Sequence, residues 1–159
     1  MTRVWRLALL LSMAVLAACA SPRVHVPGQA SWSGRLAVQV ESTPPQSFSA
    51  GFDLSGSPEV GELLLSTPLG TALATVRWSP GRAELQQGQQ IIRRTSLDEL
   101  SAEVGGTVLP VTALFAWLRG QTQAVHGWEA DLSQQPEGRV RARRLTPAPA
   151  AELRIVFEP

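Results

Sequence analysis

The sequence predicts an α+β fold in which an antiparallel sheet curls around two central helices that cover its one apolar face. Three observations predict this. Apolar and polar residues alternate along several short segments, as they do in half-buried strands. Proline and glycine separate those segments. Two segments with helical periodicity lie in the middle of the chain, so the expected order is strands, two helices, strands.

The first two strands are expected to form an antiparallel hairpin. Trp32, Leu36 and Val38 share one face of the first strand, and polar residues dominate the other. In the second strand Phe48 and Phe52 alternate with small or polar residues in the same way. The sequence Thr-Pro-Pro at 43–45 supplies the turn between them. Further strands are predicted at 62–65, 72–78, 82–86 and 89–94.

Two helices follow these strands. Ser96 and Glu99 predict a capping box, in which each side chain accepts a hydrogen bond from a backbone N–H of the first turn. Gly105 and Gly106 are expected to end that helix. A second helix is predicted to start around Pro110 and to end before Gly120. Its broad apolar face contains Val111, Leu114, Phe115, Trp117 and Leu118. Closing strands are predicted at 127–132, 140–145 and 152–157.

The N-terminus is typical of an export signal with a lipid attachment site. Arg3 and Arg6 precede an apolar run at 7–16, which is about half the roughly 20 residues needed to cross a bilayer. Leu-Ala-Ala then leads directly to Cys19, the only cysteine of the chain. We therefore expect residues 1–18 to be a removed signal peptide, 19–31 a lipidated N-terminus and tether, and 32–159 one domain. A chance cysteine beside an ordinary cleavage site is the alternative.

Charge gives no sign of a nucleic-acid partner. The chain has 14 basic and 13 acidic residues, and loss of Arg3 and Arg6 with the signal brings the mature formal charge to −1. The densest arginine run, at 139–144, lies in a predicted strand, where a solvated face is the better interpretation.

The bulky apolar residues leave one question open. Trp32, Phe48, Phe52, Trp78 and Trp128 are expected to point inward, and so is Trp117 of the second helix. A packed core and a hollow ligand cavity both need inward apolar side chains, so the pattern alone does not separate them.

These segments together carry a resemblance to a known family. The chain resembles the LolB family, the outer-membrane receptors of the bacterial lipoprotein localisation pathway. The resemblance rests on the order of several segments along the mature chain, together with the Leu-Ala-Ala-Cys lipobox: WSGRLAV at 32–38, FSAGF at 48–52, LLLSTPLG at 63–70, Leu109-Pro110, WLRG at 117–120 and Gly127-Trp128.

The resemblance implies an open half-barrel with helices on its concave side and a cavity for lipoprotein acyl chains. It implies that acylated cargo arrives from a periplasmic LolA-like carrier and is inserted into the outer membrane without nucleotide hydrolysis, with the lipid-anchored protein expected to act as a monomer. By matching position it implies that Leu69, in the loop with Pro68 and Gly70, probes the membrane. The cavity residues that we expect are Trp32, Leu36, Val38, Phe48, Phe52, Leu64, Trp78, Leu114, Trp117, Leu118 and Trp128.

The sequence departs from the family pattern in three places. The stretch from Cys19 to Trp32 is short, position 54 is leucine where an aromatic residue is common, and the tail after Trp128 is compact. Ala20 is not the aspartate that many enteric bacteria use for inner-membrane retention, which favours the outer membrane.

An enzyme is not expected. His25 lies in the predicted tether and His126 stands just before a strand, and neither has an evident nucleophile. Asp98 and Glu99 suit a helix start, where negative charge is favourable. Neither metal-ligand spacing nor a phosphate-binding loop is evident, so we expect no metal or cofactor. The competing interpretation is a lipid-anchored binding or assembly protein for another apolar ligand or partner.

Overall fold

Nine antiparallel strands form one open sheet. The computed structural model describes residues 30–103 and 110–159. The strands are β1 (Ala30–Val40), β2 (Gln46–Gly56), β3 (Gly61–Ser66), β4 (Ala72–Ser79), β5 (Arg82–Gln87), β6 (Gln90–Arg94), β7 (Trp128–Asp131), β8 (Arg139–Arg144) and β9 (Ala151–Phe157). Their order across the sheet is β6-β5-β4-β3-β2-β1-β9-β8-β7, and β6 and β7 form its two edges.

The predicted order of strands, two helices and strands is confirmed. Between β6 and β7 the chain forms α2 (Leu97–Glu103) and α3 (Val111–Leu118), and a short 3₁₀ helix, η2 (Gln135–Glu137), precedes β8. The first strand begins at Ala30, inside the range expected for the tether. Gly105 and Gly106, expected to end the first helix, lie outside the described residues.

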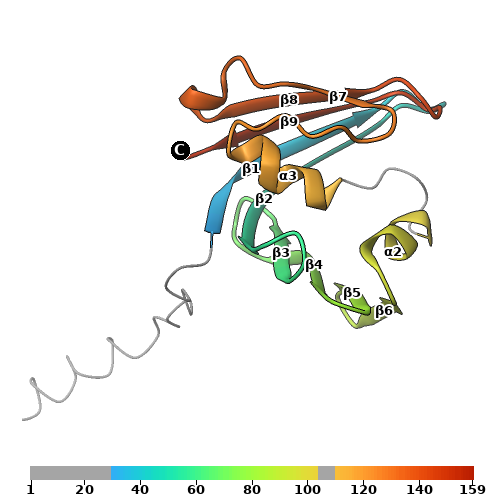
Figure 1. Ribbon diagram of the computed structural model, residues 1–159. Coiled ribbons are helices and arrows are strands. Elements are labelled where there is room, and N and C mark those ends of the chain that lie inside the picture. The colour runs from blue at the N-terminus through green and yellow to red at the C-terminus, as the bar shows by residue number, and fades with distance from the viewer. Residues whose placement is uncertain (1–29, 104–109) are drawn as a thin grey trace, which may run out of the picture.

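The hairpin of β1 and β2 forms the centre of the sheet. All eleven residues of β1 pair with β2, from Ala30 opposite Gly56 to Val40 opposite Gln46. The final strand, β9, pairs with the other side of β1 and brings the C-terminus beside the N-terminal strand. Figure 1 shows the sheet bending, so that β7, β8 and β9 run across the top while β3 to β6 lie below them. In this view α3 lies between the two parts.

Helix α2 begins with half of the predicted capping box. The Ser96 hydroxyl accepts the backbone N–H of Glu99 at 3.1 Å, as expected. The reciprocal bond differs: the Glu99 carboxylate accepts the backbone N–H of Thr95 at 3.1 Å and the Thr95 hydroxyl at 2.7 Å. These bonds lower the pKa of Glu99, with the Thr95 hydroxyl as the largest cause. The Glu99 carboxylate therefore bonds Thr95, one residue before the Ser96 position that the capping-box spacing predicts.

Helix α3 is one of the most completely buried elements described. Pro110 precedes its first turn, and the helix ends at Leu118, followed by the C-cap Arg119 and by Gly120 with φ +75°, as the sequence predicts. Val111, Ala113, Leu114, Phe115, Trp117 and Leu118 are all buried. The Gln135 side-chain amide donates to the Leu118 carbonyl at 2.7 Å, which satisfies one of the carbonyls left open at the helix end.

Candidate functional site

One face of the sheet carries almost all of its buried apolar side chains. The strand register places Leu36 opposite Ala50 and Ile155, and Val38 opposite Leu153. Further along the same face, Leu54 lies opposite Leu63, and Leu63 opposite Val76. Directly paired residues point to the same side of a sheet, so this apolar face runs continuously through the central strands. We call it the inner face.

Most of the predicted cavity residues lie in one buried cluster. These residues belong to β1, β2, β4, β7 and α3, and the structure brings them together in the core: Leu36, Val38, Phe52, Trp78, Leu114, Trp117, Leu118 and Trp128. Trp32 is only partly buried and packs against the cluster. The cluster therefore joins α3 to four strands of the inner face.

Two of the predicted cavity residues are placed differently. Leu64 lies opposite Asp53 and Thr75, on the outer face, while its neighbours Leu63 and Leu65 face inward. Phe48 lies opposite Val38 and so belongs to the inner face, but it is 42% exposed. Leu64 therefore does not belong to the inner face, and Phe48 lies on a solvent-exposed part of it.

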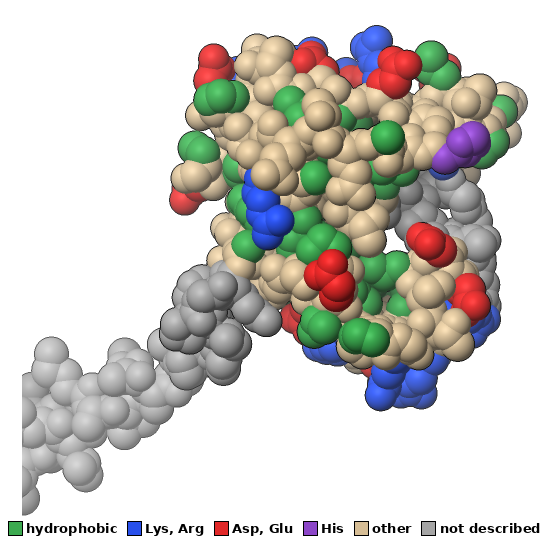
Figure 2. All heavy atoms as spheres, viewed as in Figure 1, with side chains coloured by type: hydrophobic (Ala, Val, Ile, Leu, Met, Phe, Trp, Pro, Cys, Tyr) green, Lys and Arg blue, Asp and Glu red, His purple; other side chains and the backbone are tan. Residues whose placement is uncertain are grey.

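Phe115 of α3 contacts two strands of the sheet, β1 and β4. Its ring makes edge contacts with Trp32 of β1 at a centroid distance of 5.8 Å and with Trp78 of β4 at 6.0 Å. Near the end of α3, Trp117 packs against Trp128 of β7 at 6.5 Å. Figure 2 shows hydrophobic side chains gathered in the recess between the upper and lower parts of the molecule, with charged side chains around it.

Arg119 lies beside Trp32, and its charge also acts on Glu59. The guanidinium of Arg119, just after α3, lies over the Trp32 ring at 5.5 Å from its centroid. In the turn between β2 and β3, Glu59 accepts a hydrogen bond from the Ser57 hydroxyl at 2.8 Å. That bond is the largest cause of a lowered pKa for Glu59, and the charge of Arg119 adds to it. The backbone carbonyl of Ser57 also accepts the Trp78 indole N–H at 3.0 Å.

A small cavity of about 210 Å³ lies at the starts of α2 and α3. Trp128, one of the predicted cavity residues, lines it together with Val111 and Val125. Asp98 and His126 also line it, so the structure brings together two residues that lie apart in the sequence. Arg144, another lining residue, is 6% exposed, stacks over Trp128 and donates to the Pro149 carbonyl at 3.1 Å. The volume lies below the several hundred Å³ typical of small-molecule pockets.

Leu69 occupies the tip of the turn between β3 and β4 and is 95% exposed. Backbone bonds close this turn, from Thr67 N–H to the Thr71 carbonyl at 2.8 Å and from Gly70 N–H to the Thr67 carbonyl at 2.9 Å. Gly70 has φ +83°, a conformation that favours glycine. Pro68 on the other side restricts the chain further. The sequence therefore holds this leucine away from the core instead of folding it back.

Several sequence features lie outside the described residues. Cys19, Ala20 and His25 belong to this group, as does the expected signal peptide. Within 30–103 and 110–159, none of the helices has the length and apolar composition that a membrane span requires. The same residues contain no group of three or more His, Cys, Asp or Glu side chains suited to a metal ion.

Comparison with known proteins identifies a family. The family model described as "Outer membrane lipoprotein LolB" matches residues 29–147, which is most of the chain. Three relatives named outer-membrane lipoprotein LolB are similar. The chain is 31% identical to that of Shewanella woodyi over 123 residues, covering 70% of this chain and 56% of the relative. It is 34% identical to the Dechloromonas aromatica protein over 144 residues (84% and 73% of the two chains) and 31% identical to the Thiobacillus denitrificans protein over 144 residues (84% and 75%).

The match thus spans little more than half of the Shewanella protein and about three quarters of the other two. The family match covers β1 to β8, including the inner face, the turn that carries Leu69 and helix α3. The chain therefore belongs to the LolB family of outer membrane lipoproteins.

Proposed function

We propose that this protein is a lipid-anchored receptor that accepts acylated lipoproteins from a periplasmic LolA-like carrier and inserts them into the outer membrane. The observation that carries the proposal is the inner face: an open antiparallel sheet with one continuous apolar surface, in a chain that belongs to the LolB family. The proposed cargo is the acyl chains of other lipoproteins, and the receptor acts as a monomer.

We infer that the sheet is a half-barrel whose concave side is covered by α2 and α3. The contacts of Phe115 with both Trp32 and Trp78 support this arrangement for α3, since the two tryptophans come from β1 and β4, which β2 and β3 separate in the sheet. For α2, the burial of Leu100 within the same cluster supports it. Because Phe115 is only 1% exposed, we infer that an acyl chain enters by displacing the side chains of α3 from the inner face.

Transfer between two apolar surfaces requires no nucleotide. Burial of hydrocarbon is worth about 0.8 kcal/mol per CH₂, so a long acyl chain exposed to water costs on the order of 10 kcal/mol. A handover from one apolar site directly to another avoids that cost at both ends. The free energy of the final step comes from the bilayer itself, where the acyl chains are fully buried.

Cys19 is the proposed lipid anchor, and Ala20 after it is consistent with outer-membrane residence. Residues 19–29, with Pro22, Pro27 and Gly28, would then tether β1 to the periplasmic face of that membrane. Two features support this part of the proposal: the lipobox sequence itself and the word lipoprotein in the names of the family and of the relatives.

Leu69 is the proposed membrane-inserting residue. Its 95% exposure in a turn fixed by two backbone hydrogen bonds supports the proposal, because a solvent-exposed leucine on a rigid tip gains free energy when it enters an apolar phase. Replacement by glutamate reverses that gain and places a charge at the tip, while the exposed position keeps the fold intact.

The test compares Leu69→Glu with Val60→Glu. Val60 is 46% exposed in the turn between β2 and β3, at the opposite end of β3. We expect Leu69→Glu protein to accept cargo from the carrier but to release it poorly into membranes, whereas Val60→Glu protein should perform both steps. Normal delivery by a folded Leu69→Glu protein would rule out the role assigned to this leucine.

A further inference from the structure

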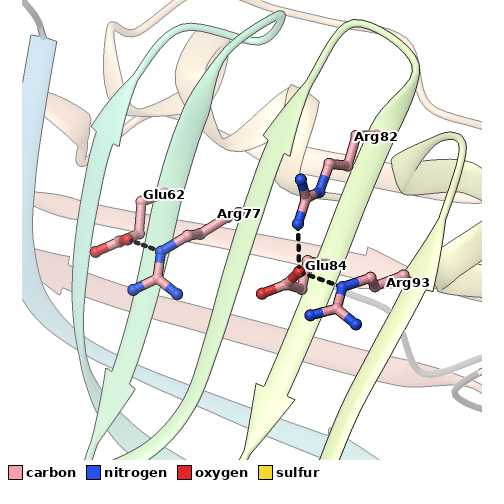
Figure 3. A network of polar contacts seen from close by, with 5 residues as sticks. All are labelled: Glu62, Arg77, Arg82, Glu84 and Arg93. Atoms are coloured by element: carbon pink, nitrogen blue, oxygen red, sulfur yellow. Dashed lines mark hydrogen bonds and ion pairs between the residues drawn. The ribbon is translucent and has the colours of Figure 1, made fainter.

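The outer face of β3 to β6 is divided into a charged row and an uncharged zone. Paired residues place Glu62, Arg77, Glu84 and Arg93 side by side across the four strands. Figure 3 shows these side chains on one face, with Arg82 beside them. Arg77 bonds to Glu62, while Arg82 and Arg93 contact the Glu84 carboxylate at 2.9 and 2.7 Å. Opposite charges therefore alternate across the whole row.

Beyond this row, toward the turn that carries Leu69, the strands contain no ionisable residue. The segments 63–76 and 85–92 consist only of apolar and uncharged polar residues, and they include the turns between β3 and β4 and between β5 and β6. Both turns lie at the same end of the strands, because the strands are antiparallel neighbours. On the adjoining strand, Asp53 borders the zone opposite Leu64.

Apolar side chains on this zone are open to solvent. Besides Leu69, Ile91 is 45% and Leu73 is 36% exposed. Ile91 lies on the same outer face as the charged row, since it is two residues from Arg93 along β6. Leu73 lies at the irregular pairing of β3 with β4, beside the turn that carries Leu69. The opposite ends of these strands differ, since Glu59 and Arg82 stand in or beside the turns there.

The depth of the uncharged zone matches a bilayer interface. Ser66, at the end of β3, lies four residues after Glu62, which corresponds to about 13 Å along the strand. The hydrocarbon core of a bilayer is about 30 Å thick and the whole bilayer about 40–45 Å. The headgroup layer on each side is therefore about 5–8 Å thick. The tip can therefore pass the headgroups before any charged side chain of β3 to β6 leaves water.

We propose that the whole uncharged zone, and not Leu69 alone, is the membrane-docking surface, with the row Glu62–Arg77–Glu84–Arg93 setting the depth to which it enters. The occupant is the headgroup and outer acyl region of a phospholipid bilayer. A bilayer fits better than a protein partner because charge is absent over two whole hairpin ends and resumes in a single row across all four strands. This inference rests on the proposed function, to which it adds the orientation of the receptor at its membrane.

The test measures the depth of single residues in the membrane-anchored full-length protein. Ile91→Cys and Val60→Cys variants provide a matched pair, since the two native side chains are 45% and 46% exposed, and Leu69→Cys marks the tip. Each is labelled with a fluorescent probe and reconstituted into vesicles of phosphatidylethanolamine and phosphatidylglycerol that contain acyl-chain nitroxide phosphatidylcholine. The parent protein, labelled in parallel, corrects for any probe on Cys19.

We expect the nitroxide lipid to quench the probes at 69 and 91 and to leave the probe at 60 close to its unquenched intensity. Ile91→Asp should reduce quenching of the probe at 69, whereas Val60→Asp should not. Quenching at 69 alone would overturn the inference and leave the proposed receptor function standing, because cargo transfer is measured separately. A probe at 91 that responds to the carrier and not to lipid would also overturn it, in favour of a protein contact.

Discussion

Phe115 is a buried side chain of α3 that packs against two tryptophans of the inner face. It is 1% exposed and contacts Trp32 and Trp78 at once. We expect Phe115→Ala to lower the free energy of unfolding by about 3–5 kcal/mol, the usual range for a buried phenylalanine, because both ring contacts and the surrounding packing are lost. Urea denaturation followed by tryptophan fluorescence measures this.

Phe48→Ala is the matched control for that experiment. Phe48 lies on the same face but is 42% exposed, so its removal should cost much less than removal of Phe115. Equal losses for the two variants would show that Phe115 does not hold the helix against the sheet.

Gly34 is a second residue whose identity is fixed by its surroundings. A Cβ at this position would lie 2.1 Å from the Val156 carbonyl oxygen and 2.8 Å from the Phe157 Cα, both in the backbone of β9. We therefore expect Gly34→Ala to push β9 away from β1 and to destabilise the protein by about 1–3 kcal/mol, as other overpacked sites do. The shift of the urea midpoint reports the loss.

Gly51→Ala serves as the comparison, because the nearest atom to its added Cβ is the Ser66 hydroxyl at 2.8 Å, which a side-chain rotation moves aside. If Gly34→Ala were no more destabilising than Gly51→Ala, the close approach of β1 and β9 would not constrain the sequence.

Individual residues also show where the sequence stops being informative. Leu63, Leu64 and Leu65 form an apolar run without alternation, so the pattern does not say which of them faces inward, and only the pairing of β3 with β2 and β4 decides it. Phe48 has the correct alternation, but its exposure depends on how far the covering side chains reach. The exposure of Phe48 is therefore a tertiary property that the neighbouring sequence does not indicate.

At the scale of elements the sequence is far more informative. Each predicted strand and both helices are present, because alternation, proline and glycine breaks and a capping residue are local signals. The position of β9 between β1 and β8 has no such signal, since it depends on which distant strand offers a matching edge. The irregular pairing between Leu65 and Ser66 just before the Leu69 turn is likewise visible only in the structure.

The charged row across β3 to β6 gives the sheet a predictable response to acid. Hydrogen bonds from Arg82, and then from Arg93, lower the pKa of Glu84 from its usual value of 4.5. A lowered pKa means that the unfolded chain binds the proton more readily, so this stabilisation is present above pH 4.5 and is lost as pH falls through the folded-state pKa.

We therefore expect Glu84→Gln to be less stable than the parent at pH 7, with the difference shrinking as the pH falls below 4.5. Urea midpoints measured from pH 7 downward test this. A difference between parent and variant that stays constant with pH would mean that the carboxylate charge contributes nothing in the row.

At the scale of the whole molecule, three functions fall to three separate parts. In our proposal the N-terminal cysteine anchors the protein, the inner face binds acyl chains, and the uncharged ends of β3 to β6 meet the membrane. Cys19 precedes β1 in the sequence, and acyl binding is assigned to the inner face, so the anchor is positional in this proposal. We expect a soluble form that starts after the signal and carries Cys19→Ala to keep its affinity for cargo and to lose its attachment to the membrane.

Co-purification with an acylated lipoprotein, after mixing with loaded carrier, measures the first property, and flotation with vesicles measures the second. Loss of cargo binding in this soluble form would show that the acyl group on Cys19 takes part in binding.

Our main proposal is that the inner face accepts the acyl anchors of other lipoproteins. It is tested most directly by incubating the soluble Cys19→Ala form with a LolA-like carrier loaded with an acylated lipoprotein, without nucleotide, and determining by native mass spectrometry which protein holds the cargo. We expect stoichiometric movement of the lipoprotein to this chain. Cargo that stays on a carrier known to be active, while this chain captures a different apolar ligand, would contradict it.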